Sequence, residues 1–121
     1  MQVINTNLVT KEPATGTLFT GGAVTRQPLV SEQMGSDFIV SIVNFSKGAR
    51  NKFHSHTSDQ VLIVTNGTGV VATEKEEVVV GVGDIIHIPA GEKHWHGATK
   101  DSEFSHIFVY AAGSQTTQIE D

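Results

Sequence analysis

The sequence has no cysteine, which excludes disulfide bonds, thiolate metal sites and cysteine nucleophiles. Positive charge is scarce, because eight Lys and Arg stand against 13 Asp and Glu and the formal net charge is −5. This balance argues against nucleic acid as a partner. No apolar run approaches the roughly 18 residues that a membrane-spanning helix needs, so we expect no membrane partner. The first residues lack the basic and apolar regions of a signal peptide, and we therefore expect a cytoplasmic protein.

Helical periodicity is also scarce, and its place is taken by short apolar runs rich in Val and Ile. The runs predict strands at Phe38–Phe45, Lys52–His56, Gln60–Asn66, Gly69–Thr73, Glu77–Val80, Asp84–Ile88, Lys93–Gly97 and Phe104–Tyr110. Asn66-Gly67, between two such runs, predicts a hairpin because both residues tolerate positive φ. Many short strands without intervening helices favour an all-β sandwich or barrel.

A chain of 121 residues without an internal repeat or a linker predicts one domain. We place this domain at residues 18–112. Residues 1–17 are then an N-terminal segment and residues 113–121 a C-terminal tail, and we expect both of these polar segments to be loosely held.

The six histidines all fall between positions 54 and 106. The pairs His54/His56 and His94/His96 have the i, i+2 spacing that puts both rings on one face of a strand. Neutral imidazole is the commonest protein metal ligand. A lone histidine in a strand is more often a hydrogen-bonded core residue, but two such pairs in one small β domain favour a metal site.

Spacing alone does not decide which residues complete that site. Gln60 follows His56 by four residues and is one candidate ligand. The spacing equally allows His96 as a ligand in place of Gln60 or His94. His106 lies on a strand whose inward face the pattern leaves open. It is either a core residue or a general base or acid near the metal. His87, between two isoleucines, is interpreted as a packing residue.

Two motifs resemble those of the cupin superfamily. The first is Gly48, five residues, His54-Ser55-His56, three residues, Gln60, six residues and Gly67. The second is Gly83, five residues, Pro89-Ala90-Gly91, two residues and His94. The chain departs from the family at Gln60, where cupins often have Glu, and at Ala98, where they often have Asn.

Longer strings resemble a bacterial subgroup of small single-domain cupins that includes manganese-dependent hydroxynitrile lyases and carboxymuconolactone decarboxylase-like proteins. These strings are Phe19–Val24, Gly48-Ala49-Arg50, Gln60–Thr65, Gly91–Ala98 and Ser105-His106-Ile107. Asn51-Lys52-Phe53 differs from the subgroup, whose members tend to have Thr and small or Trp residues there. The resemblance therefore indicates lineage more strongly than substrate.

The resemblance implies a cupin jelly-roll β-barrel of antiparallel strands, commonly a homodimer. It implies His54, His56, Gln60 and His94 as metal ligands, which leaves His96 as a supporting or packing residue. Such ligands suit Mn, Fe, Ni or Zn, and the subgroup favours Mn. The resemblance also supports a catalytic role in proton transfer for His106.

A shell of three imidazoles and one carboxamide is neutral, so a divalent ion keeps its full charge and favours Lewis-acid chemistry over redox chemistry. We therefore expect a metal-dependent lyase on a small oxygenated organic substrate, by cyanohydrin cleavage or synthesis or by decarboxylation. The alternatives are a metal-dependent dioxygenase and a non-catalytic cupin that binds a metal or a small molecule.

Overall fold

The computed structural model describes residues 1–121, and its regular secondary structure is almost entirely β-strand. The helices are two 3₁₀ turns, η1 (Thr6–Leu8) and η2 (Glu32–Met34), and neither has the length or the apolarity that a membrane crossing requires. The strands are β1 (Glu12–Pro13), β2 (Phe19–Thr20), β3 (Val24–Val30), β4 (Phe38–Phe45), β5 (Arg50–Asn51), β6 (His54–His56), β7 (Gln60–Thr73), β8 (Glu77–Gly81), β9 (Ile85–Ile88), β10 (His94–Ala98), β11 (Phe104–Ala111) and β12 (Thr116–Gln118). The all-β class expected from the sequence is confirmed.

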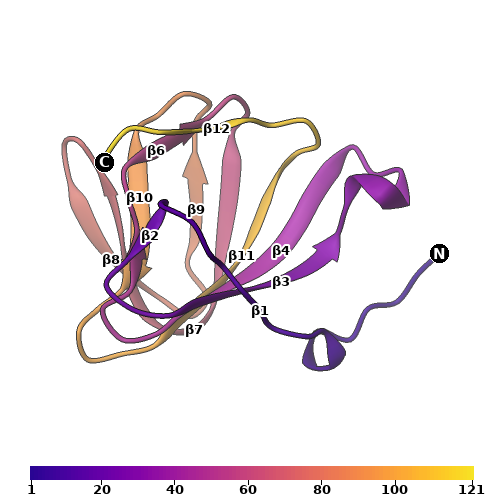
Figure 1. Cartoon of the computed structure of the whole chain (residues 1–121), viewed down its shortest axis with the longest axis horizontal. Coiled ribbons are helices and arrows are strands. Elements are labelled where there is room, and N and C mark those ends of the chain that lie inside the picture. The colour runs from indigo at the N-terminus through magenta and orange to yellow at the C-terminus, as the bar shows by residue number, and fades with distance from the viewer.

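One long strand, β7, joins two sheets into a curled antiparallel barrel (Figure 1). Its residues 60–67 pair with β11, which continues the first sheet through β4 and β3 to β1. Its residues 69–73 pair with β10, which leads through β5 to β2 in the second sheet. The edge strands β9 and β8 pair with the first and second parts of β7, respectively. The expected antiparallel jelly-roll barrel is confirmed.

The predicted hairpin at Asn66-Gly67 is wrong, because β7 runs through both residues without reversing. Gly67 has a φ of 72° and lies opposite Phe104, next to a register shift between Ser105 and His106. A Cβ atom on Gly67 would collide with the carbonyl oxygen of Glu103. The positive φ that the sequence indicated is real, but it bends the strand from one sheet into the other.

Several short strands lie outside the predicted set. The predicted strand Lys52–His56 is replaced by β5 and β6, which are separated by two residues. β3 was missed because Arg26, Gln27 and Pro28 interrupt the apolar alternation by which strands are recognised. The expectation of a loose C-terminal tail is also wrong, because β12 pairs with β6 along its whole length.

The core lies between the two sheets and decides which face of β11 points inward. Phe104, His106 and Phe108 are buried on one face, together with Phe45 and Leu62 from the neighbouring strands. Ser105, on the other face, donates a hydrogen bond to Asn44 on the outside of the barrel. His106 is therefore an interior residue, which the strand pattern alone could not decide.

Candidate metal centre

Three histidines meet inside the barrel. β6 contributes His54 and His56, and β10 contributes His94, whose Cα is paired with that of His54 in the antiparallel ladder. One nitrogen from each ring lies within 4.8 Å of the nitrogens of the other two. All three side chains are buried, so the strands hold the rings in place. This cluster could hold a divalent metal ion.

Backbone carbonyls fix the tautomers of two of these rings. His54 Nδ1 donates to the carbonyl oxygen of Lys52 at 2.6 Å, and His94 Nδ1 donates to that of Glu92 at 2.8 Å. Because a carbonyl only accepts hydrogen bonds, each Nδ1 carries the hydrogen and each Nε2 offers a lone pair. His56 Nδ1 lies 2.8 Å from the Thr116 hydroxyl, which can accept in the same way. Such bonds on the distal nitrogen are typical of metal-ligating histidines.

The atoms that would face a metal ion have no partner within the protein. His56 Nε2, His94 Nε2 and Gln60 Oε1 are buried and form no hydrogen bond, and the same holds for His106 Nδ1 outside the cluster. Buried polar atoms are almost always paired, so three such atoms together need an explanation. Gln60 lies at the start of β7, where its Cα is paired with that of Tyr110. Imidazole lone pairs and an amide oxygen are donors that a divalent transition metal accepts, and the residues therefore fit such an ion.

Burial keeps the three rings neutral. Loss of solvation, together with the neighbouring His94, lowers the pKa of His54 to about 3 and that of His56 to about 4. The pKa of His94 is also lowered by burial, although the Glu92 carbonyl acts against this. Neutral imidazole is the form that binds metals, so this site needs no deprotonation at neutral pH.

The other two interior histidines form a pair beside the cluster. His106 Nε2 lies 3.0 Å from His96 Nδ1, and both rings are fully buried. Asn51 holds His96 by accepting its backbone N–H at 2.8 Å. Burial lowers the pKa of His106 to about 4 and that of His96 well below its usual value. Both rings are therefore neutral at neutral pH.

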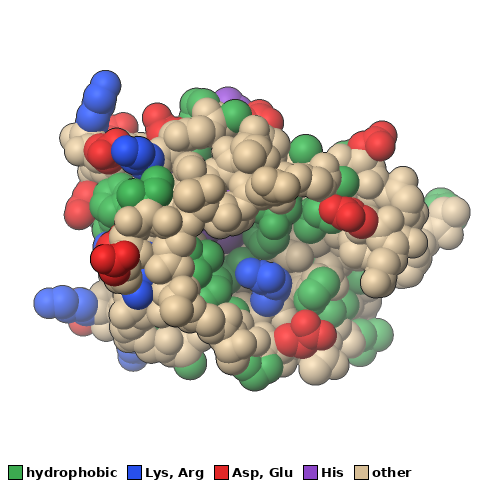
Figure 2. Space-filling model, turned by 45° about the horizontal axis from the view of Figure 1, so that its top comes forward, with side chains coloured by type: hydrophobic (Ala, Val, Ile, Leu, Met, Phe, Trp, Pro, Cys, Tyr) green, Lys and Arg blue, Asp and Glu red, His purple; other side chains and the backbone are tan.

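A small cavity of about 60 Å³ adjoins the histidines, and Figure 2 shows histidine inside a hollow with apolar and basic side chains at its rim. Its lining is Leu18, Phe19, Arg26, Val43, Asn51, His54, His56, Gln60, His96, Phe108, Tyr110 and Thr116. None of these residues is acidic. His96 lines this cavity, whereas His106 lies behind His96 and does not.

Sequence reasoning missed three polar residues of this lining, Arg26, Tyr110 and Thr116. Arg26 lies on the unpredicted strand β3, and Thr116 lies in the tail that was expected to be loose. Neither position carries a signal in the sequence, because each reaches the site through strand pairing. Tyr110 had a signal, since it follows His106 by four residues and therefore shares its face of β11.

His87 lies away from the centre. Its Nε2 is 2.9 Å from Asp59 Oδ2, and both side chains are more than half exposed. The interpretation of His87 as a packing residue is therefore wrong, because its side chain points to solvent rather than into the core.

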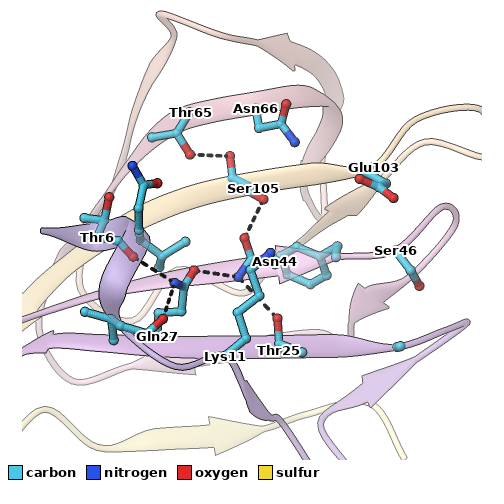
Figure 3. Close-up of a pocket in the computed structure, with 15 residues that line it drawn as sticks. Thr6, Lys11, Thr25, Gln27, Asn44, Ser46, Thr65, Asn66, Glu103 and Ser105 are labelled. Atoms are coloured by element: carbon cyan, nitrogen blue, oxygen red, sulfur yellow. Dashed lines mark hydrogen bonds between the residues drawn. The ribbon is translucent and has the colours of Figure 1, made fainter.

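A larger cavity of about 710 Å³ lies on the outside of the first sheet, beneath the N-terminal segment (Figure 3). Gln27 donates to the carbonyls of Thr6 and Val9 at 3.2 and 2.9 Å. Asn44 donates to Gln27 at 3.0 Å and accepts from Ser105 at 2.7 Å. Gln27, Asn44 and Ser105 thus find hydrogen-bond partners within the protein, and no histidine lines this cavity.

Curated relatives match part of this chain. The chain is 40% identical over 68 residues to an (R)-mandelonitrile lyase of Granulicella tundricola, which covers 55% of the chain and 52% of that protein. It is 41% identical over 49 residues to an acireductone dioxygenase of Leptospira biflexa, over 37% of the chain and 28% of that protein. The chain thus spans about half the length, or less, of these relatives.

Solved structures match nearly the whole chain. A cupin-like protein from Thermotoga maritima superposes with a TM-score of 0.86 at 30% identity, over 94% of this chain and 89% of that one. A polyketide cyclase from Streptomyces resistomycificus shares the fold, with a TM-score of 0.88 at 19% identity, over 98% of this chain and 85% of that one. The family model described as a cupin domain matches residues 41–110, more than half of the chain. The chain therefore belongs to the cupin family.

Proposed function

We propose that this protein is a metal-dependent lyase that cleaves or forms a carbon–carbon bond beside an oxygen-bearing carbon of a small organic molecule. The observation that carries the proposal is the donor set. Three neutral imidazoles lie together, the unpartnered Gln60 carboxamide lines the same cavity as two of them, and no carboxylate lines that cavity. Such a shell does not reduce the charge of a bound ion.

In this proposal His54, His56 and His94 hold the ion through Nε2 and Gln60 holds it through Oε1. Manganese is the proposed metal, and iron, nickel and zinc suit the same donors. When bound, the ion supplies Lewis acidity toward a substrate oxygen, and this is strongest when no ligand is anionic.

The protein's own groups would handle the proton. His96 lines the cavity and contacts His106, so the pair can accept the proton of a substrate hydroxyl. In cyanohydrin cleavage the O–H bond and the carbon–cyanide bond break, and an aldehyde forms. The pair then returns the proton to cyanide, which leaves as hydrogen cyanide. His106 thus keeps its predicted part in proton transfer and acts through His96.

The name of the Granulicella relative supports cyanohydrin cleavage as the first reaction to test. Manganese-loaded protein is incubated with racemic mandelonitrile while benzaldehyde is followed by its absorbance, and a parallel arm measures CO₂ release from 2-oxo acids. We expect either benzaldehyde from mandelonitrile or CO₂ from a 2-oxo acid, in each case without consumption of oxygen. Full metal occupancy with no product in either arm, across a range of pH, would overturn the proposal.

A dioxygenase is the second candidate, because the chain also matches acireductone dioxygenases. An oxygen electrode separates the two functions. A dioxygenase consumes one O₂ for each substrate turned over and requires a redox-active metal, whereas the lyase works equally well under argon.

A further inference from the structure

Arg26 lies on β3, far in sequence from both cupin motifs, and lines the cavity of the histidine cluster. Its Cα is paired with that of Val43, which in turn is paired with that of His106. Residues paired in this way share one face of a sheet, so Arg26, Val43 and His106 all belong to the inner face. The guanidinium is the only permanently charged group among the lining residues.

The guanidinium of Arg26 has no acidic partner. The ion pairs of the chain join Arg50 to Glu120 and His87 to Asp59. Glu12 lies opposite Arg26 in the β1–β3 ladder, yet no carboxylate oxygen is within 4.0 Å of the Arg26 side chain. By contrast, Arg50 forms an ion pair with Glu120, and its guanidinium stacks on the Trp95 ring. Arg26 therefore keeps its donors free for a ligand.

Tyr110 stands beside Arg26 in the same lining. Its ring centroid is 5.3 Å from that of His56, which places it next to the metal centre. Burial raises the pKa of the Tyr110 hydroxyl, the charge of Arg26 acts to lower it, and the carboxylate of Glu32 acts to raise it. The hydroxyl thus keeps its proton at neutral pH and can donate a hydrogen bond.

The charge of the cavity is opposite to that of the whole protein. The chain carries a net charge of −5, but the cavity combines one guanidinium, neutral imidazoles and no carboxylate. Arg26 itself is exposed to solvent, at the outer end of the cavity, whereas the histidines are buried. A divalent ion on the histidines would add two more positive charges there. Such a field attracts anions and disfavours cations at the mouth of the cavity.

We propose that Arg26 is a specificity-determining residue that selects substrates bearing a carboxylate, which the guanidinium and the Tyr110 hydroxyl hold by charge-assisted hydrogen bonds. Planar guanidinium and carboxylate groups match each other in two parallel hydrogen bonds. The space of about 60 Å³ admits only a few heavy atoms, which restricts the inner part of the ligand to a small acid. This inference rests on the proposed metal centre, and within the proposed lyase class it favours decarboxylation over neutral cyanohydrins.

The test compares glycolate with its uncharged analogue glycolamide, by calorimetric titration of zinc-loaded protein, so that no turnover is needed. We expect Arg26→Met to weaken glycolate binding by about 10- to 100-fold, because a charge-assisted contact is lost. We expect glycolamide affinity to change less than about twofold, since the amide offers no charge. Arg26→Lys keeps the positive charge but lacks the planar guanidinium group. Its affinity for glycolate should lie between those of the unmodified protein and Arg26→Met.

Lys47→Met is the matched control, because it removes one positive charge at an exposed position outside the cavity. It should leave the affinity for both ligands unchanged. Glu12→Gln removes the carboxylate that is paired with Arg26 across the β1–β3 ladder and should tighten glycolate binding. Metal content is measured for every variant, so that a loss of the ion is distinguished from a loss of selectivity.

Equal effects of Arg26→Met on glycolate and glycolamide, or no effect on either, would overturn the inference. A protein that shows the selectivity but neither releases CO₂ nor cleaves mandelonitrile would keep the inference and overturn the proposed reaction. A protein that cleaves mandelonitrile while Arg26→Met leaves glycolate binding unchanged would keep the proposed reaction and overturn the inference about Arg26.

Discussion

Two cavities lie on opposite faces of the first sheet, and they differ in whether the polar atoms beside them have hydrogen-bond partners. The outer one, about 710 Å³, is lined by side chains such as Gln27, Asn44 and Ser105 that hydrogen-bond to one another or to the backbone (Figure 3). The inner one, about 60 Å³, adjoins buried lone pairs on His56 and Gln60 that have no partner. Satisfied polar groups stabilise a fold, whereas unsatisfied ones indicate a missing ligand. Size alone would have pointed to the cavity without histidines.

The two faces also differ in how they respond to protons. The histidines of the interior are buried and held neutral, and their pKa values lie below the usual range. The outer cavity contains no histidine, and its charged residues are Lys11 and Glu103. Changes at the inner face should therefore alter metal binding and pH dependence, while changes at the outer face should alter stability alone.

The largest expected effect is the loss of the metal on His94→Ala. This change removes one of three converging nitrogens, and we expect metal content to fall from one equivalent per chain to nearly zero. Elemental analysis after gel filtration measures it. Asn44→Ala, on the outer face, is the control and should keep one equivalent of metal per chain. A His94→Ala protein that retained one equivalent would show that the cluster is not the binding site.

The second effect is a loss of stability of the metal-free protein as the pH falls from 7.5 to 5. Unfolded histidines take up protons near pH 6.5, whereas folded His54, His56 and His106 do so only near pH 3–4. The unfolded state therefore binds more protons in this window, and the free energy of unfolding decreases by up to about 1.4 kcal/mol per pH unit for each histidine.

Urea unfolding at a series of pH values measures this decrease. His87→Gln is the control, because His87 is exposed on the surface, and its curve should follow that of the unmodified protein. A urea midpoint that stays constant between pH 7.5 and 5 would contradict the burial of neutral rings.

The third effect concerns Thr116, whose hydroxyl lies 2.8 Å from His56 Nδ1. Thr116→Val keeps the shape but removes the hydrogen bond that orients the ring, and we expect metal affinity to fall by about 10- to 100-fold. Competition with a chelator measures it. Thr117→Val is the matched control, since adjacent strand residues point to opposite faces. Equal affinities for the two variants would remove the role assigned to Thr116.

The smallest effect is on the outer face. Gln27→Ala removes two donated hydrogen bonds to Thr6 and Val9, and we expect a loss of about 1–2 kcal/mol with unchanged metal content. Hydrogen exchange of the Leu8 and Val9 amides should also become faster, because the segment loses its attachment. Gln33→Ala, at an exposed position, should change neither property. Altered metal binding in Gln27→Ala would show that the two faces are coupled.

Much of the site was predictable because its motifs are local. Strand alternation puts His54 and His56 on one face, and the paired cupin motifs indicated Gln60 and His94 as their companions. The same local rules failed at Asn66-Gly67, where a positive φ is compatible with a hairpin and with a bent strand. They also failed at β3, where Pro28 and polar residues hide a strand that tertiary pairing stabilises.

The sequence by itself determined the class of fold and placed His54 and His56 on one face of a strand, because strand alternation acts over a few residues. Only the tertiary structure decided which histidine faces the cavity and which lies behind it. It also decided that Arg26 and Thr116 reach the centre, since each arrives on a strand paired with a distant part of the chain. Such pairings depend on how complete sheets pack, and they cannot be predicted from short stretches of sequence.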